Sequence, residues 1–430
     1  MQLWVLGSDI DFRGHAACKA RHSLFNRNES PSWTSSSGST VELEYGSGAL
    51  SVWPGTDTVT FAGAAVTMNL GVASSSTSQP WLCFEQDGIL GLAYPSLAQV
   101  SSTPWFFAWA DATASKRVMS FYLSPHGQGG SSISLGAVDD SHGLGEWYWL
   151  PLLEYTSAGR TTHAFFGAQI YFAERSSFVG ISEAGDKTLI AAAQYVATES
   201  AKSPVVPGVV DTGTSLLLMP QSNFIDFAEA VFAAASADEH PCAQAGNSGE
   251  IVCPEAALHV LPNITLTFKA AAQGGGHGSL LDVVLSAALY TCCDEPCASA
   301  GFCAVRVSGL PSTLASDEWL LGDTFQIAFA TAYDMDENRV GIRAMTAGSI
   351  RPSTHELPPD KSPVRGYWLI IGAIAGGLAL VLFVAYGVRR CRRQQHAGEN
   401  GSRTAGGNNT INPLTHQAVH GPTVAELGPV

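Results

Sequence analysis

An aspartate in a glycine turn between two apolar runs is the strongest chemical signal in the sequence. Asp211 lies in the segment VVDTGTSLLL, residues 209–218. The apolar flanks predict a buried carboxyl group, and because an unpaired buried charge is costly, this group should have a use. Gly213 lets the backbone come close to a ligand, and the Thr214 hydroxyl can donate a hydrogen bond to the carboxylate. The alternative, an exposed β-turn, fits the apolar flanks poorly.

The elements that must position this turn are predicted to be mostly β-strands. Residues 41–72 alternate apolar with small or polar residues between glycine and proline, which is typical of short strands and hairpins. The same alternating pattern recurs at residues 131–135, 147–153, 170–172, 263–268 and 328–333. A helical pattern occurs mainly at residues 220–235, with proline at its start and apolar residues three and four apart. We therefore predict an all-β fold with a few short helices.

Composition and missing motifs exclude several classes of protein. The 430 residues include 37 acidic and 22 basic ones, and a net charge of -15 argues against a nucleic-acid partner. A hydrophobic content of 46% argues against a disordered chain. The sequence has no Gly-x-Ser-x-Gly elbow, no His-Glu-x-x-His and no Walker loop, and its 12 histidines are scattered. We expect neither a metal nor another cofactor.

One segment predicts a membrane anchor. Residues 367–386 are twenty residues without a charge, the length of a helix that crosses a bilayer, and we place the helix at residues 367–388. A buried core helix, the alternative, would normally carry a polar stripe. Four arginines within residues 389–393 follow the helix, and the positive-inside rule places them in the cytoplasm. Gly372 and Gly376 offer a close-packing face on which the helix can dimerise.

The predicted anchor separates the chain into a part on the outer or luminal side and a cytoplasmic tail. We expect a single-pass type I membrane protein of the secretory or endolysosomal pathway or the cell surface. Residues 347–366, rich in proline, should form a stalk, and residues 389–430 a disordered cytoplasmic tail. The first residues do not resemble a secretory signal, so we expect the natural chain to begin further upstream.

The cysteines agree with an oxidising compartment. Eight of the nine precede the predicted anchor, which favours disulfides. Zinc is the alternative for the cluster at residues 292–303, but that cluster lacks two C-x2-C pairs. Asn28 and Asn263 begin glycosylation sequons on the same side of the membrane, so we expect a glycoprotein.

Taken together, the motifs resemble those of the pepsin family of aspartic endopeptidases. The sequence DTGTS at residues 211–215 is similar to the family's second catalytic motif, and YGSG at 45–48 lies where the family carries its flap hairpin. Residues 87–95 and 319–323 resemble the segments that close the two active-site loops. The resemblance spans residues 2–345, although residues 156–200 match poorly. It implies a bilobal fold, with an N-terminal lobe at 1–150 and a C-terminal lobe at 151–346.

The resemblance also implies a reaction. In the family, a water molecule activated between two aspartates hydrolyses a peptide bond of a peptide or protein substrate. Asp211 would supply one aspartate. The other lies, in the family, a few residues before a segment similar to residues 3–5, so the sequence as given lacks it and should be inactive alone. Asp9 and Asp11 follow Trp4 without a glycine two residues later and are not its equivalent. A catalytically inactive, pepsin-like binding protein is the alternative function.

Supporting roles follow from the same resemblance. Tyr45 is similar to the flap tyrosine, which closes over the substrate and forms a hydrogen bond with the ring nitrogen of Trp4. Thr212 would brace the two catalytic loops, and Phe106 either walls an apolar pocket or packs in the core. The substrate backbone should be bound by two flap residues and two floor residues: Gly46, Ser47, Gly213 and Thr214.

Disulfide pairings are implied in part. The family joins two stretches of its C-terminal lobe, so we expect Cys253 to pair with Cys292 or Cys293. The lone cysteine in the family's first disulfide loop leaves that bridge lost or rerouted. Two further pairings stay open: Cys242 with Cys297 or Cys303, and Cys18 with Cys83.

Overall fold

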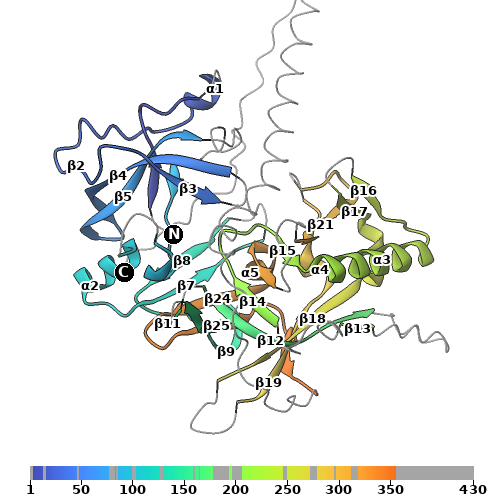
Figure 1. Ribbon diagram of the computed structural model, residues 1–430. Coiled ribbons are helices and arrows are strands. Elements are labelled where there is room, and N and C mark those ends of the chain that lie inside the picture. Colours follow the sequence, from blue (N-terminus) through green and yellow to red (C-terminus); the bar gives the residue numbers. More distant parts are fainter. Residues whose placement is uncertain are drawn as a thin grey trace, which may run out of the picture.

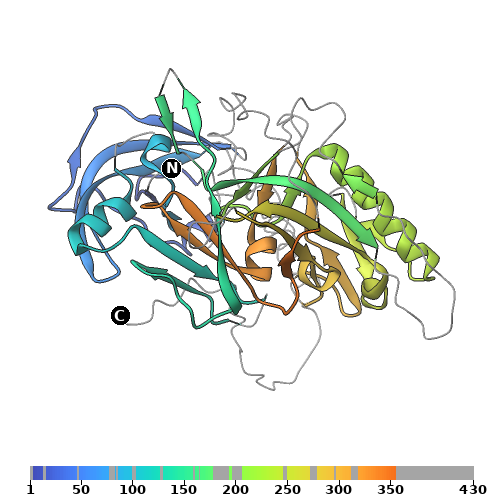
Figure 2. The same ribbon diagram turned by 90° about the horizontal axis from the view of Figure 1, so that it is seen from below.

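The computed structural model places most of the chain before residue 355. The described residues are 3–12, 16–45, 48–76, 83, 86–98, 103–125, 129–157, 160–163, 165–177, 193–195, 206–245, 249–271, 278–294, 297–310 and 318–354. Among them strands predominate, and they form two lobes with a further sheet between the lobes (Figures 1 and 2). The predicted β-rich, bilobal organisation is therefore confirmed.

The N-terminal lobe is built on a six-stranded sheet. Its strands are β1 (Trp4–Leu6), β2 (Thr34–Ser35), β3 (Val41–Tyr45), β4 (Gly48–Phe61), β5 (Ala64–Ser76) and β6 (Gly88–Ile89). They run in the order β2-β4-β5-β1-β6, with β3 paired to β4. Trp4 joins Leu50 and Val52 in a buried core cluster, which fixes β1 within the sheet.

The C-terminal lobe holds a nine-stranded sheet. Eight strands follow one path: β22 (Val307–Gly309), β15 (Leu217–Met219), β23 (Trp319–Leu321), β14 (Val206–Val210), β12 (Gly167–Ser177), β18 (Pro262–Lys269), β19 (Leu280–Leu285) and β26 (Ile350–Pro352). The ninth, β13 (Ala193–Tyr195), pairs with β12. Every residue of β14, β15 and β23 is buried, the pattern of strands that are covered on both faces.

A five-stranded sheet brings distant parts of the chain together. Its order is β8 (Ser132–Leu135), β7 (Val118–Tyr122), β24 (Phe329–Asp334), β25 (Arg339–Ala344) and β9 (Leu144–Pro151). Strands from residues 118–151 thus flank two strands from residues 329–344. β24 is the central strand of this sheet, and all of its residues are buried. A small hairpin, β10 (Tyr155–Ser157) with β11 (Arg160–Thr162), follows β9.

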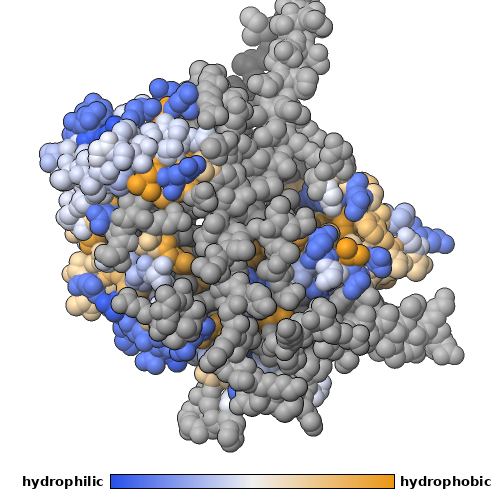
Figure 3. All heavy atoms as spheres, in the orientation of Figure 1, coloured by the Kyte–Doolittle hydropathy of each residue, from blue (hydrophilic) through white to orange (hydrophobic). Residues whose placement is uncertain are grey.

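Helices are few. They are α1 (Ala16–Lys19), α2 (Trp105–Thr113), α3 (Gln221–Ala237), α4 (Ala287–Tyr290) and α5 (Asp323–Ala328), with 3-10 turns η2 (Pro95–Leu97) and η4 (Glu255–Val260). The helix predicted at residues 220–235 is confirmed as α3, which Pro220 precedes. Helix α2 was not predicted. Phe106 within it is 0% exposed and stacks on Trp109, so it packs in the core. On the face in Figure 3, apolar colour gathers near α3, where Ile225 is exposed.

The disulfides contradict the expected C-terminal pairing. The four bonds are Cys18–Cys83, Cys242–Cys253, Cys292–Cys297 and Cys293–Cys303. Cys18–Cys83 is the pairing left open above. The expectation that Cys253 pairs with Cys292 or Cys293 was wrong, and so were the partners considered for Cys242.

Strand register explains two of the observed disulfide bonds. A four-stranded sheet runs in the order β16 (Ala243–Ala245), β17 (Glu250–Pro254), β21 (Phe302–Val305) and β20 (Thr291–Cys292). The β16–β17 register pairs Ala243 with Val252, so Cys242 lies opposite Cys253, with Cα atoms 4.1 Å apart. The β20–β21 register brings Cys293 opposite Cys303 in the same way, at 4.0 Å. Each of these two disulfides therefore joins an outer strand to its neighbour.

Some expectations fall outside the described residues. These are the helix at 367–388, the tail at 389–430 and residues 355–366 of the stalk expected at 347–366. The first part of that stalk segment instead contains β26, which pairs with β19 in the C-terminal sheet. In the part of the chain that the structure describes, no helix has both the length and the apolar character needed to span a membrane. Of the two sequons, Asn28 is exposed, whereas Asn263 lies within β18 and is 6% exposed. A glycan on Asn263 is incompatible with this packing.

Candidate active site

Three strands position Asp211. β14 leads into the turn, β15 leads out of it, and β23 lies between them, parallel to β14 and antiparallel to β15. The amide of Asp211 donates to the carbonyl of Leu321 at the end of β23, at 3.2 Å. The amide of Thr214 donates back to the carbonyl of Asp211, also at 3.2 Å. The turn is therefore closed by its own backbone and attached to the strand that it crosses.

Gly322 allows the chain after β23 to pass close to the turn that carries Asp211. A Cβ at this position would lie 2.0 Å from the carbonyl oxygen of Thr214 and 2.4 Å from that of Leu216. Real Cβ atoms do not approach backbone oxygens so closely, so only glycine fits beneath the turn. The residue after it, Asp323, donates its amide to the same Thr214 oxygen at 2.6 Å.

The carboxylate of Asp211 is held by donors from its own turn. The amide of Gly213 donates to Oδ1 at 2.9 Å, and the hydroxyl of Thr214 donates to Oδ2 at 2.7 Å. The residue keeps a partly exposed edge although protein surrounds its carboxyl group. Burial raises the pKa of Asp211, while the bonds from Thr214 and Gly213 oppose the rise. Such a group can hold a proton at acidic pH and release it, as a general acid or base must.

A second carboxyl group lies beside the turn. Asp323 begins α5, and burial together with the charge of Asp211 raises its pKa to about 7, against the opposing charge of Arg306. Two nearby carboxyl groups resist simultaneous ionisation, because the second negative charge must be created next to the first. Asp323 therefore favours a protonated state in the acidic range.

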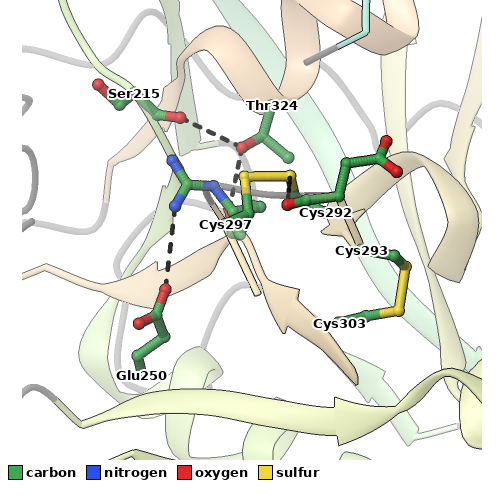
Figure 4. The surroundings of a disulfide bond; sticks show 9 residues. Ser215, Glu250, Cys292, Cys293, Cys297, Cys303 and Thr324 are labelled. Carbon is green, nitrogen blue, oxygen red and sulfur yellow. Dashed lines mark hydrogen bonds and ion pairs between the residues drawn. A yellow bond between two sulfur atoms is a disulfide. The ribbon is translucent and has the colours of Figure 1, made fainter. Parts of the chain in front are cut away.

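Helix α5 is also tied to the turn through Thr324. Its hydroxyl donates to the carbonyl of Arg306 at 3.0 Å and to that of Ser215 at 3.3 Å (Figure 4). Arg306 forms a loose ion pair with Glu250, 3.9 Å between Nη1 and Oε1. The disulfides of the cluster at residues 292–303 lie next to this set of residues in Figure 4. Arg306 directly follows β21 (Phe302–Val305), so the hydrogen bond from Thr324 to its carbonyl links α5 to the end of a strand in the disulfide-bearing sheet.

The N-terminal lobe repeats the strand arrangement of the site. β1 is parallel to β5 and antiparallel to β6, as β15 is parallel to β22 and antiparallel to β23. Trp4 lies opposite Ile89 in the first set, and Leu218 lies opposite Leu320 in the second. A Cβ on Gly88 would lie 2.1 Å from the carbonyl of Trp4, so a glycine makes a close crossing here too. β1 is therefore the counterpart of β15, the strand that leads out of the Asp211 turn.

The structure places the other sequence-predicted residues as follows. Thr212 and Gly213 are exposed at the tip of the turn, where a bound peptide could reach the backbone, while Thr214 is buried. Trp4 is 4% exposed in β1. Tyr45 ends β3 at the base of the expected flap, but its side chain, and Gly46 and Ser47, lie outside the described residues. The roles predicted for these three residues stay predictions.

Sequence analysis placed residues 319–323 in a segment that closes an active-site loop, but it assigned no individual role to Gly322, Asp323 or Thr324. The signal was present, because Asp323 follows the apolar run of β23 as Asp211 follows that of β14. An aspartate within two residues of the end of a buried strand is the shared pattern. The pairing of β14 with β23, which brings the two together, is a tertiary feature that the local pattern does not contain.

Comparison with known proteins identifies the family. The family model described as eukaryotic aspartyl protease matches residues 1–345. Pepsin-2B of Gadus morhua is 29% identical over 342 residues, covering 79% of this chain and 87% of the relative. Gastricsin of Oryctolagus cuniculus is 30% identical over 332 residues, covering 75% and 71%. A pregnancy-associated glycoprotein of Equus caballus is 29% identical over 331 residues, covering 76% and 71%. The chain belongs to the eukaryotic aspartyl protease family.

Proposed function

We propose that this protein is a membrane-anchored aspartic endopeptidase, with Asp211 as one member of its catalytic pair. The observation that carries the proposal is the carboxyl group of Asp211, buried, hydrogen-bonded in its charged form and raised in pKa. Family membership supports peptide-bond hydrolysis in general. The anchor at residues 367–388 and the luminal or outer placement of the lobes rest on the sequence pattern and on the disulfides, which suit an oxidising compartment.

The reaction needs a second aspartate that faces Asp211. Strand register supports its place: Trp4 corresponds to Leu218, and Asp211 precedes Leu218 by seven residues. The partner therefore belongs to the segment that leads into β1, seven residues ahead of Trp4. One carboxyl group of the pair holds a proton and polarises the scissile carbonyl, while the ionised one takes a proton from the attacking water.

The exposed tip of the turn suits a peptide substrate. Thr212 and Gly213 present backbone groups to the solvent beside Asp211, and backbone hydrogen bonds are the contacts that bind an extended peptide independently of its sequence. Flap residues 45–47 would close over the peptide from the N-terminal lobe. Bulky apolar residues at the cleaved bond are the substrate class we propose.

Peptide cleavage by the natural gene product tests this proposal. We expect hydrolysis at acidic pH of a peptide with two adjacent bulky apolar residues, and a loss of about 10²–10⁴-fold or more in Asp211→Asn. Glu229→Gln, on the exposed face of α3, is the matched control and should keep full activity. Full activity in Asp211→Asn would overturn the proposal. Peptide binding without cleavage by the wild type would favour the pepsin-like binding protein instead.

A further inference from the structure

A buried polar cluster connects α5 with β24. The hydroxyl of Tyr333 donates to Oε1 of Gln326 at 3.0 Å, and the hydroxyl of Thr331 donates to the same oxygen at 3.3 Å. Gln326 and Tyr333 are each 1% exposed, and Thr331 is 0% exposed. Polar groups at this depth lose their contact with bulk water, so the fold must satisfy them internally.

The amide of Gln326 is only half satisfied. Its Nε2 is buried and has no acceptor among the residues that the structure describes. Reversing the amide would let Nε2 donate to the oxygens of Tyr333 and Thr331, but Oε1 would then lack a donor. In either orientation one polar atom of the amide needs a partner. Buried groups of this kind are commonly satisfied by an internal water.

Asp323 offers the second anchor that such a water needs. It lies three residues before Gln326 in α5, and residues three apart are neighbours on one side of a helix, with Cβ atoms about 5–6 Å apart. Its carboxyl group makes no hydrogen bond to another described residue. A water molecule between two such neighbours can bond to both the amide and the carboxyl group.

We propose that Gln326 binds an internal water that also forms a hydrogen bond with the carboxyl group of Asp323. Gln326 is then a positioning residue: it acts through the water on a carboxyl group beside the catalytic turn. The water completes a chain from Thr331 and Tyr333 to Asp323, whose amide holds the turn at Thr214. The water site rests on packing alone and does not depend on the proposed function.

The electrostatic effect of this water has a definite sign. A water that donates to the ionised carboxylate favours the charged form, so its loss should raise the pKa of Asp323 further. Asp211 opposes ionisation of Asp323 and Arg306 favours it. The titratable groups on the elements packed against α5 are Tyr290, Tyr333, Tyr122 and Asp334, and Asp334 is paired with Arg339. Tyr290 instead donates to the carbonyl of Pro262, and Tyr122 stacks on His142.

A crystal structure of the full chain, at a resolution that places waters, tests the site directly. We expect a water within hydrogen-bond distance of the Gln326 amide and of the Asp323 carboxyl group. In Gln326→Leu, which replaces the amide by an apolar group of similar volume, this water should be absent. An ordered Gln326 without a water, or one bonded directly to Asp323, would overturn the proposal, and the wild-type structure alone decides this.

A titration separates the role of the water from that of the fold. With carbon-13-labelled aspartate, NMR should show the midpoint of Asp323 shifted upward by about one pH unit in Gln326→Leu. Thr331→Val is the matched control, because it leaves the amide of Gln326 and its bond from Tyr333 in place, and it should leave the midpoint unchanged. An unchanged midpoint in a folded Gln326→Leu would contradict the proposed role. Neither readout requires proteolysis, so a failure of the proposed function would not affect them.

Discussion

Asp211 and Asp323 influence each other because their carboxyl groups share one buried region. Asp211 has two donors from its own turn, which stabilise its charged form. Asp323 has none among the described residues, and its pKa rises to about 7. The partner whose charged form is better hydrogen-bonded ionises first, and its charge then holds the other in the protonated state. Between about pH 4 and pH 7, Asp323 therefore carries a proton that it would lose in the unfolded chain.

This proton makes stability depend on pH. The folded-state pKa of Asp323, about 7, exceeds its ordinary value of 3.8, so its contribution to stability is complete below about pH 4 and declines until about pH 7. In Asp323→Asn this decline should be missing. The melting temperature of the variant should therefore exceed that of the wild type by a margin that grows as the pH rises from 4 to 8. We expect this margin to reach about 2–4 °C or more. Parallel melting curves for the two proteins would contradict the raised pKa.

The residue-level chemistry was predictable only in part. The Asp-Thr-Gly-Thr pattern identified Asp211, and the bond from Thr214 to its carboxylate is present as inferred from the spacing. Asp323 was missed as a site residue because its role depends on β23 lying next to β14. The flap residues were predicted from resemblance alone. Local sequence shows which residue types are present, whereas the distance between two carboxyl groups comes from tertiary pairing.

At the scale of elements, the site depends on a strand that passes beneath the turn. Gly322 allows this, so Gly322→Ala should force the Thr214 carbonyl away and lower the free energy of unfolding by about 2 kcal/mol or more. Gly38→Ala is the control, because a Cβ there meets nothing within 4 Å. Denaturant unfolding of the two variants measures the difference. Equal stability of both variants would show that the crossing is looser than the structure indicates.

The disulfides show that the pairing of strands, rather than the resemblance to the family, determines which cysteines are bonded. The partner expected for Cys253 came from the family's pattern, but the registers of the β16–β17 and β20–β21 pairs set two of the three bonds in this lobe, Cys242–Cys253 and Cys293–Cys303. Helix α3 was predictable because its apolar spacing is long and begins at Pro220. Helix α2 is short and nearly all apolar, so its sequence lacks the periodic contrast that marks a surface helix.

A tryptic digest without reduction checks this connectivity. Residues 203–269 contain Cys242 and Cys253, and residues 270–306 contain the other four cysteines of the lobe; neither segment contains an internal Lys or Arg. The observed pairing keeps all three bonds within these segments, so mass spectrometry should detect two separate, internally cross-linked peptides. One joined peptide of their summed mass would instead support a bond between Cys253 and Cys292 or Cys293.

At the scale of the whole molecule, charge and disulfides support the orientation that we propose for the membrane anchor. Residues 389–430 carry five arginines against two glutamates, whereas the chain as a whole has a net charge of -15. In sealed vesicles, added protease should remove a C-terminal tag and spare the disulfide-bonded lobes. Solubilising the vesicles should abolish that protection, which is the control. Loss of the lobes with retention of the tag would reverse the proposed topology.

The most direct test of the central claim, that Asp211 acts as one of two coupled aspartates, is the pH dependence of kcat/KM for the natural gene product. Because the pair must share one proton, we predict a bell-shaped profile with its maximum at acidic pH. The activity at that maximum should disappear in Asp211→Asn and persist in Glu229→Gln. A rate that rises steadily into alkaline pH, or full activity without the Asp211 carboxylate, would contradict the account.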